Sequence, residues 1–247
     1  MPQSGSVRRN KALTGAVLTG DIVNTNPNSN ANSGTDMLRA SGGSVSPASC
    51  GCEKNISGCG ITGGASVEPD KGAYAAGYMD DGRIFQYAVL SSSEIPFSQS
   101  VVEACRQNKC GRYGTCWTCP PGVGDPEELE ARIKSYSTAA VFTCKYELED
   151  SFDIDGMSRG AVTTQRILLE KAELLRKDGA DFMVLGCEGC ILCEKCSYPD
   201  APCRFPDKAI PSVEACGINV VELAAKSGLR YNNGPCTVTY FCLILIR

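Results

Sequence analysis

Histidine is absent from all 247 residues of this chain. Its absence excludes Cys/His zinc sites, histidine general bases, histidine-ligated haem and Rieske centres. Any metal must therefore be held mainly by sulfur, and sulfur ligands favour zinc, Cu(I) or iron–sulfur clusters. The chain also lacks motifs for nucleotide, flavin or S-adenosylmethionine, including the Cys-x-x-x-Cys-x-x-Cys pattern of radical enzymes.

Long apolar runs and excess positive charge are lacking as well. No apolar run reaches the roughly 20 residues that a membrane-spanning helix needs, so we expect no membrane span. Lys and Arg number 24 against 28 Asp and Glu, and this net charge of −4 leads us to expect no nucleic-acid partner. The basic N-terminal residues precede only a short, interrupted apolar stretch, so we predict no export signal and a cytoplasmic location.

Cysteine, by contrast, is abundant, with 16 residues in the chain. In an exported protein, disulfides would be the first interpretation. Most of these cysteines are clustered, and no export signal is predicted. Metal ligation is therefore favoured over disulfide bonds.

The densest cluster, here called the second cysteine group, contains Cys190, Cys193, Cys196 and Cys203. The first three recur at intervals of three residues, the fourth follows after a six-residue loop, and Pro206 lies three residues further on. A cubic iron–sulfur cluster needs four converging thiolates, and bacterial ferredoxins use a similar run with a proline after the fourth cysteine. The group therefore predicts a [4Fe–4S] cluster. Structural zinc is the alternative, although zinc sites usually join two separate Cys-x-x-Cys knuckles.

The first cysteine group lies upstream, within fifteen residues, and contains Cys105, Cys110, Cys116 and Cys119. Glycines within it allow tight turns, and two prolines stiffen its exit. The two groups together supply the eight thiolates that two cubic clusters need. Which cysteine serves which cluster stays open, because two-cluster ferredoxins exchange their fourth ligands. For the first group, whose spacing is irregular, a zinc knuckle or reduced thiols are the alternatives.

Aromatic and basic residues accompany both groups. Tyr113 and Trp117 either shield a metal site from water or belong to the ordinary core. Four basic residues either offset the charge of thiolate clusters and dock an acidic electron donor, or form a solvated rim: Arg106, Lys109, Arg112 and Arg204.

The composition divides the chain into two parts. Residues 1–70 are rich in Ser, Gly, Asn and Thr, and we expect a flexible or partner-bound low-complexity arm. Cys50, Cys52 and Cys59 in this arm form either an additional metal or partner site or free thiols. Residues 71–247 form the predicted cysteine-rich metal-binding or iron–sulfur domain.

Periodicity and capping signals predict an α+β or α/β domain with a sheet of about four strands. We expect strands over residues 83–90, 139–146, 182–185 and 237–246, with the last in the centre of the sheet. Helices are expected to start at Asp125 and to span residues 159–177 and 219–226, with one helical turn in residues 211–217. The two cysteine groups then lie in loops at the strand ends.

Several motifs resemble those of a known family. They are Cys105 to Pro121 with its Tyr-Gly and Cys-Pro-Pro elements, Cys190 to Pro206 with Pro-Cys-Arg-x-Pro, Pro211-Ser-Val-Glu-Ala, and Thr-Val-Thr-Tyr-Phe at 237–241. The resemblance covers residues 84–247 and is to the uncharacterised bacterial and archaeal cysteine-rich family known only as predicted metal-binding protein. It implies a metal or iron–sulfur protein, of a kind suspected in anaerobic metabolism.

The resemblance also bears on individual cysteines. Cys105, Cys110 and Cys119 match the family's first motif, whereas relatives carry other residues at Cys116. The second cysteine group matches the second motif throughout. The remaining cysteines of the domain are interpreted as non-ligands: Cys144, Cys187, Cys216, Cys236 and Cys242.

Three functions are compatible with these observations. The first is an electron-transfer protein with two [4Fe–4S] clusters and a redox partner or larger enzyme complex. The second is an enzyme, if Cys116 is not a ligand and one cluster iron keeps an open coordination position for substrate. The third is an interaction protein with structural zinc.

Overall fold

The computed structural model describes the backbone of residues 69–247 and the side chains from residue 71 onward. The low-complexity arm predicted for residues 1–70 lies outside the described residues, except for its last two. Cys50, Cys52 and Cys59 lie outside them as well.

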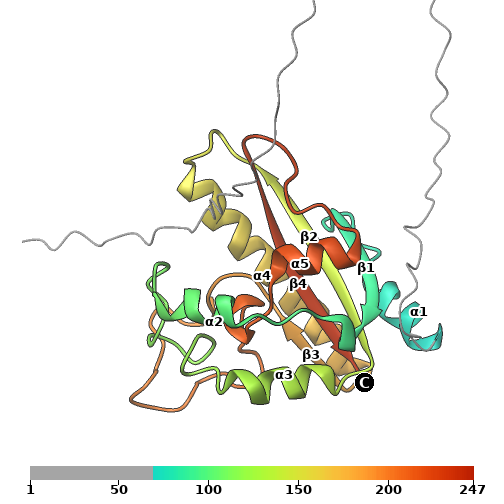
Figure 1. Cartoon of the computed structure of the whole chain (residues 1–247), viewed down its shortest axis with the longest axis horizontal. Coiled ribbons are helices and arrows are strands. Elements are labelled where there is room, and N and C mark those ends of the chain that lie inside the picture. The colour runs from blue at the N-terminus through green and yellow to red at the C-terminus, as the bar shows by residue number, and fades with distance from the viewer. Residues whose placement is uncertain (1–68) are drawn as a thin grey trace, which may run out of the picture. The chain divides into compact units, whose positions relative to one another are not determined.

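A four-stranded antiparallel sheet forms the centre of the described part (Figure 1). Its strands are β1 (Gln86–Ser91), β2 (Thr138–Glu147), β3 (Phe182–Leu185) and β4 (Thr237–Ile246), in the spatial order β1-β2-β4-β3. Every pairing is antiparallel. This arrangement confirms the α+β prediction and not the α/β alternative, because α/β folds are built on parallel strands.

Strand β4 is an inner strand of the sheet, as its apolar sequence predicted. It pairs with β2 along its full length, so that Thr138 lies opposite Ile246 and Glu147 opposite Thr237. The last seven residues of β4 are all buried. A strand covered on both faces needs apolar side chains on both, which explains why the polar alternation in this segment is weak.

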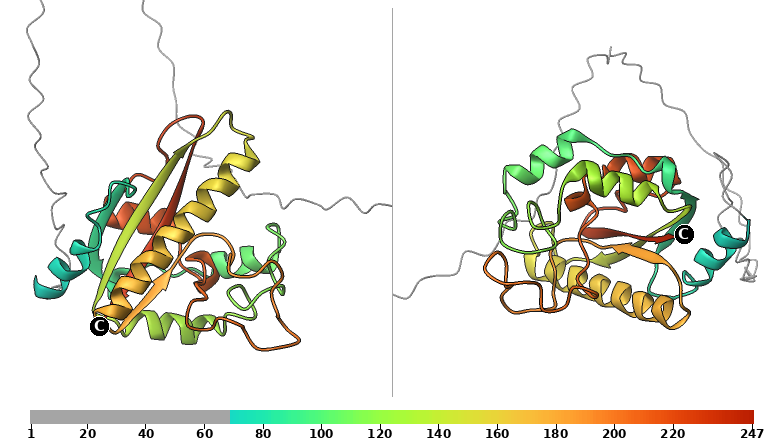
Figure 2. Two further views of the ribbon diagram at one scale, coloured as in Figure 1. Left: turned by 180° about the vertical axis from the view of Figure 1, so that it is seen from behind. Right: turned by 90° about the horizontal axis from the view of Figure 1, so that it is seen from below.

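Helices cover both faces of the sheet (Figure 2). The long helix α4 (Ile154–Lys177) and α1 (Pro69–Gly77) pack on one face. The opposite face is covered by α3 (Pro126–Lys134), α5 (Val220–Ser227) and the short 3-10 helix η2 (Glu214–Cys216). A further helix, α2 (Gln99–Arg106), lies against η2, and the 3-10 helix η1 (Ser92–Glu94) follows β1.

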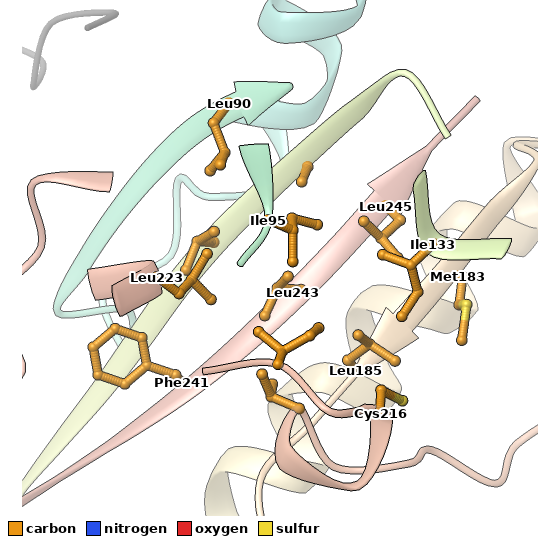
Figure 3. Close-up of a cluster of buried hydrophobic side chains, with 14 of the residues drawn as sticks. Leu90, Ile95, Ile133, Met183, Leu185, Cys216, Leu223, Phe241, Leu243 and Leu245 are labelled. Carbon is orange, nitrogen blue, oxygen red and sulfur yellow. The ribbon is translucent and has the colours of Figure 1, made fainter. Parts of the chain in front are cut away.

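Each face has its own hydrophobic core. On the α3 side, Ile133, Leu223 and Leu243 are fully buried, as Figure 3 shows. On the α4 side, the predicted helix face of Leu168, Ala172 and Leu175 is fully buried, and Cys144 packs with it as predicted. Burying one large aliphatic side chain stabilises a fold by about 1.5–3 kcal/mol, so these two cores hold the sheet and helices together.

The predicted elements match the structure closely, with four differences. Strand β1 begins at Gln86, three residues after the predicted start at residue 83. Helix α4 begins at Ile154, five residues before the predicted start, because the Asp153 side chain caps it by accepting a hydrogen bond from the Gly156 amide at 2.7 Å. Helix α2 was not predicted, since it is only eight residues long and has no fully buried face. Helix α1 was not predicted either; it starts at Pro69, two residues before the predicted start of the domain at residue 71.

The helix-capping and helix-ending residues predicted from the sequence are confirmed. Asp125 caps α3 with Pro126 in the first turn, and Asn219 caps α5. Gly179 has a φ of 71° directly after α4, the left-handed conformation that ends many helices. In the part of the chain that the structure describes, no helix has both the length and the apolar character needed to cross a bilayer.

Candidate metal-binding site

The fold brings the two cysteine groups to one place. The first group begins in the last turn of α2 and continues in the loop of residues 107–124, which follows this helix. The second group lies in the loop of residues 187–211, which follows β3. The green and orange loops lie side by side in every view of Figures 1 and 2.

The second loop is closed at its base by backbone hydrogen bonds. The Gly186 amide donates to the carbonyl of Pro211 at 2.8 Å, and the Val213 amide donates to the carbonyl of Gly186 at 2.9 Å. Within the loop, Arg204 donates to the Lys195 carbonyl at 2.9 Å. A long segment without helix or strand is therefore fixed to the end of the sheet at both of its ends.

Trp117 joins the two loops. Its indole Nε1 donates to the Ala201 carbonyl at 3.1 Å, and its ring packs edge-on against Tyr198 with centroids 4.9 Å apart. Gly122 permits this contact, because a Cβ at this position would lie 2.6 Å from the Cys116 carbonyl oxygen and 2.9 Å from the Tyr198 ring. Trp117 belongs to none of the hydrophobic core clusters of the described residues, so it acts at the junction of the loops.

A cavity of about 210 Å³ lies between the loops, and five cysteines line it. Four of them are the complete second cysteine group, and the fifth is Cys116 from the first group. Each member of the second group is partly buried, whereas Cys116 is buried. Tertiary structure therefore places Cys116 with the second cysteine group, although the sequence places it beside Cys119.

The remaining three members of the first group lie outside this cavity but adjoin it. Cys119 is buried and donates a hydrogen bond to Cys116. Cys110 is exposed and is near enough to act electrostatically on both Cys119 and Cys105. The Cys105 thiol contacts the carbonyl of Glu214 in η2 at 3.8 Å. Cys116 thus links the two groups, because it lines the cavity with the second group and accepts a hydrogen bond from Cys119 of the first.

The described side chains contain no preformed single-ion site. Among residues 71–247, no three Cys, Asp or Glu side chains converge closely enough to hold one metal ion. A tetrahedral zinc ion with Zn–S bonds of about 2.3 Å draws its four sulfurs to about 3.8 Å from one another. A cubic cluster binds each thiolate through a different iron, so its ligand sulfurs stay further apart. All 13 described cysteines are free thiols.

Arg112 provides positive charge where the two loops meet. Its guanidinium packs on Gly189, where an added Cβ would lie 2.8 Å from the guanidinium carbon, and it lines the cavity. The pKa of Cys116 is lowered to about 5, chiefly because Cys119 and then Thr118 donate hydrogen bonds to its thiolate, with Arg112 contributing. Burial raises the pKa of Cys190, and the charges of Cys193, Cys203 and Cys116 add to this rise.

The other basic residues divide between the two predicted roles. Arg204 lines the cavity together with Arg112. Arg106 pairs with Glu103 at 3.2 Å, and Lys109 is exposed. Two of the four therefore belong to the site, and two have positions typical of a solvated surface.

The cysteines interpreted as non-ligands do not line the cavity. Cys144 and Cys242 are buried on the sheet face beneath α4, close to Cys187. Cys216 belongs to the opposite core, as Figure 3 shows. Thr118 was missed by the sequence reasoning; it is buried, and its hydroxyl lies 3.6 Å from the Cys116 sulfur. Its only sequence signal is its position between two cysteines.

Comparison with protein families agrees with this geometry. The model of the family described as predicted metal-binding protein (DUF2284) matches residues 88–246. The chain belongs to this family. The match contains both cysteine groups and confirms the family resemblance, whereas Cys50, Cys52 and Cys59 precede it. Searches of curated proteins and of solved structures gave no match. Family membership supports metal binding and leaves the kind of metal and its role to chemical argument.

Proposed function

We propose that this protein binds two [4Fe–4S] clusters through the eight cysteines of its two groups and transfers electrons to or from a partner oxidoreductase. The observation that carries the proposal is the cavity of about 210 Å³ lined by five thiols from two loops about 70 residues apart in sequence. When bound, such clusters supply one-electron redox chemistry. Structural zinc is the alternative, and metal analysis distinguishes the two.

The chain's own residues suit this role. Arg112 and Arg204 place positive charge at the cavity and offset the negative charge of a thiolate-ligated cluster. Trp117 and Leu192 line the cavity and limit the access of water. The partial exposure of the second cysteine group brings one edge of that cavity to the surface, within reach of a redox partner. Because free thiols persist in reducing compartments, we place the protein in the cytoplasm.

The assignment of ligands centres on Cys116. It lines the cavity with the second cysteine group and accepts a hydrogen bond from Cys119, so it can serve the cluster of either group. If it serves the second group's cavity, then Cys105, Cys110 and Cys119 are three ligands for the other cluster. That cluster then needs one of the five cavity thiols as its fourth ligand, or it keeps an open iron.

Metal analysis after anoxic purification tests the proposal. We expect about eight iron and eight sulfide per chain, brown colour near about 400 nm and a paramagnetic resonance signal after reduction. A colourless protein with about two zinc ions per chain would overturn the redox proposal while leaving a sulfur-ligated metal site.

The Cys116→Ser variant sharpens the assignment. If Cys116 is an essential ligand, iron falls from about eight to about four per chain. If eight irons remain and added small ligands change the resonance spectrum, one iron has an open coordination position, as the enzyme alternative requires. Cys236→Ser is the matched control, since Cys236 is only partly buried and lies outside the cavity.

A further inference from the structure

A second, larger cavity adjoins the cysteine cavity. It has a volume of about 1000 Å³ and lies between α3, α4, β3 and the loop of residues 199–211. Four residues line both cavities: Trp117, Thr118, Cys203 and Ala209. A molecule in the larger cavity would therefore contact Cys203 and would be separated from the other members of the second cysteine group by one layer of side chains. Its volume is at the upper end of the range for small-molecule sites, about 300–1000 Å³.

The wall of this larger cavity is mainly apolar. Phe182, Met183 and Val184 contribute from β3, which is an edge strand because it pairs only with β4. Leu129 of α3 and Ile210 of the second loop add further apolar surface. This surface favours a ligand with a hydrophobic body, because burying apolar area from water is the main source of its affinity.

Two arginines lie on this wall, one from each helix. Arg132 of α3 is exposed, and its side chain has no ion pair or hydrogen bond among the described residues. Arg176 of α4 is fixed by a hydrogen bond to the Asp207 carbonyl, while its buried Nη1 has no hydrogen-bond partner among the described residues. Nη1 also lies 3.1 Å from a carboxylate oxygen of Glu173, and the guanidinium carbon lies 5.7 Å from the centroid of the Phe182 ring, so the charge of Arg176 already has a partner.

The guanidinium of Arg132, whose donors are unused among the described residues, can bind a carboxylate through charge-assisted hydrogen bonds. The cavity also contains two carboxylates, Asp200 and Asp207, on the side of the second loop. They disfavour a ligand that carries several negative charges. The combination selects a ligand with one anionic end and an apolar body.

We propose that this cavity binds an apolar monocarboxylic acid, with its carboxylate at Arg132 and its body against β3. The inference deepens the proposed function by giving the cluster site a neighbouring ligand. The binding measurements that test this inference do not require the clusters to be present. Only the resonance measurement on the reduced protein does.

The probe pair is 2-naphthoate and its neutral analogue 2-naphthamide, measured by equilibrium dialysis against the full chain under anoxic conditions. We expect 2-naphthoate to bind about tenfold or more tightly than 2-naphthamide, because a hydrogen bond to a charged group contributes about 1.5–3 kcal/mol. Equal affinity, or no binding of 2-naphthoate, would overturn the proposal, and this comparison needs no variant.

A pair of variants locates the bound acid. Arg132→Gln should weaken 2-naphthoate binding about tenfold and leave 2-naphthamide unchanged. Arg166→Gln is the matched control, because Arg166 is exposed on α4 and lies outside the cavity. Equal effects of the two variants on 2-naphthoate would exclude the cavity. Trp117 is the only tryptophan of the chain, so its fluorescence reports binding directly at the shared wall.

The two proposals fail in different ways. If the resonance signal of the clusters is present but 2-naphthoate does not bind, the cavity inference is wrong and the iron–sulfur proposal stands. If the protein lacks iron but binds 2-naphthoate in an Arg132-dependent manner, the cavity inference stands and the iron–sulfur proposal is wrong. If both hold, we expect 2-naphthoate to shift the resonance spectrum of the reduced protein.

Discussion

In the sheet, Val141 of β2 and Leu243 of β4 are fully buried between two layers of helices. The cysteine loops, residues 107–124 and 187–211, contain no helix or strand. The hydrogen bond from Trp117 to the Ala201 carbonyl and the contact of Trp117 with Tyr198 join them. Apolar burial in the sheet and helices therefore stabilises the fold. The loops carry the chemistry and are positioned by the ends of those elements.

The largest expected effect comes from breaking the core of the sheet. Leu243→Ala removes a fully buried side chain from the inner strand, and we expect a loss of about 2–5 kcal/mol in the free energy of unfolding. Val221→Ala on α5 is the control, since Val221 is 51% exposed and its truncation should have little effect. Chemical denaturation measures both. If removal of the metal alone unfolds the wild-type protein completely, the loops and not the sheet provide most of the stability.

An intermediate effect is expected at the ion pair between the α1–β1 connection and α4. The Asp81 carboxylate lies 2.8 Å from Lys171, and the two side chains are only 12% and 7% exposed. Arg83 and Lys171 donate hydrogen bonds to it, and both hold the pKa of Asp81 well below its usual range. Asp81→Asn should destabilise the fold by about 1–3 kcal/mol, since it leaves the Lys171 charge without its partner.

The same pair predicts a pH dependence. The lowered pKa of Asp81 means that its contribution is complete above the unfolded-state pKa of about 4 and is lost as the pH falls below it. Denaturation curves between about pH 6 and 2 should therefore converge for the wild-type and Asp81→Asn proteins. Asp80→Asn, at the exposed neighbouring residue, should parallel the wild type. A constant difference at all pH values would contradict the ionic origin.

The smallest effect is expected at the junction of the loops. Trp117→Phe keeps an aromatic ring but removes the hydrogen bond to the Ala201 carbonyl, which contributes about 1 kcal/mol. Hydrogen exchange should increase in residues 187–211 and stay unchanged in β2 and β4. Phe152→Leu, at a ring that is 87% exposed, is the control. Increased exchange in β4 would mean that the loops and the sheet unfold together.

Most of the fold could be predicted from local patterns. Strands 182–185 and 237–246 match β3 and β4 residue for residue, because a continuous apolar run bounded by polar residues leaves few alternatives. Helix α2 was missed, because helices of two turns carry little periodicity. The antiparallel pairing and the strand order were also beyond the sequence, since they depend on contacts between segments far apart in the chain.

The candidate site divides in the same way. The spacing of the second cysteine group already indicated one metal-binding loop, because ligands three residues apart converge within a single turn. The position of Cys116 could not be predicted, since it depends on how Trp117 packs against the second loop. The cavity beside β3 gave no sequence signal, because its lining residues come from five separate segments.

The sequence by itself determined which atoms can bind a metal: without histidine and with 16 cysteines, the ligands must be thiolates, and this follows from side-chain chemistry alone. Tertiary structure decided which thiols share a cavity and which arginines face the neighbouring one. These relations are distances between residues far apart in the chain, and only the packing of helices and loops around the sheet fixes them.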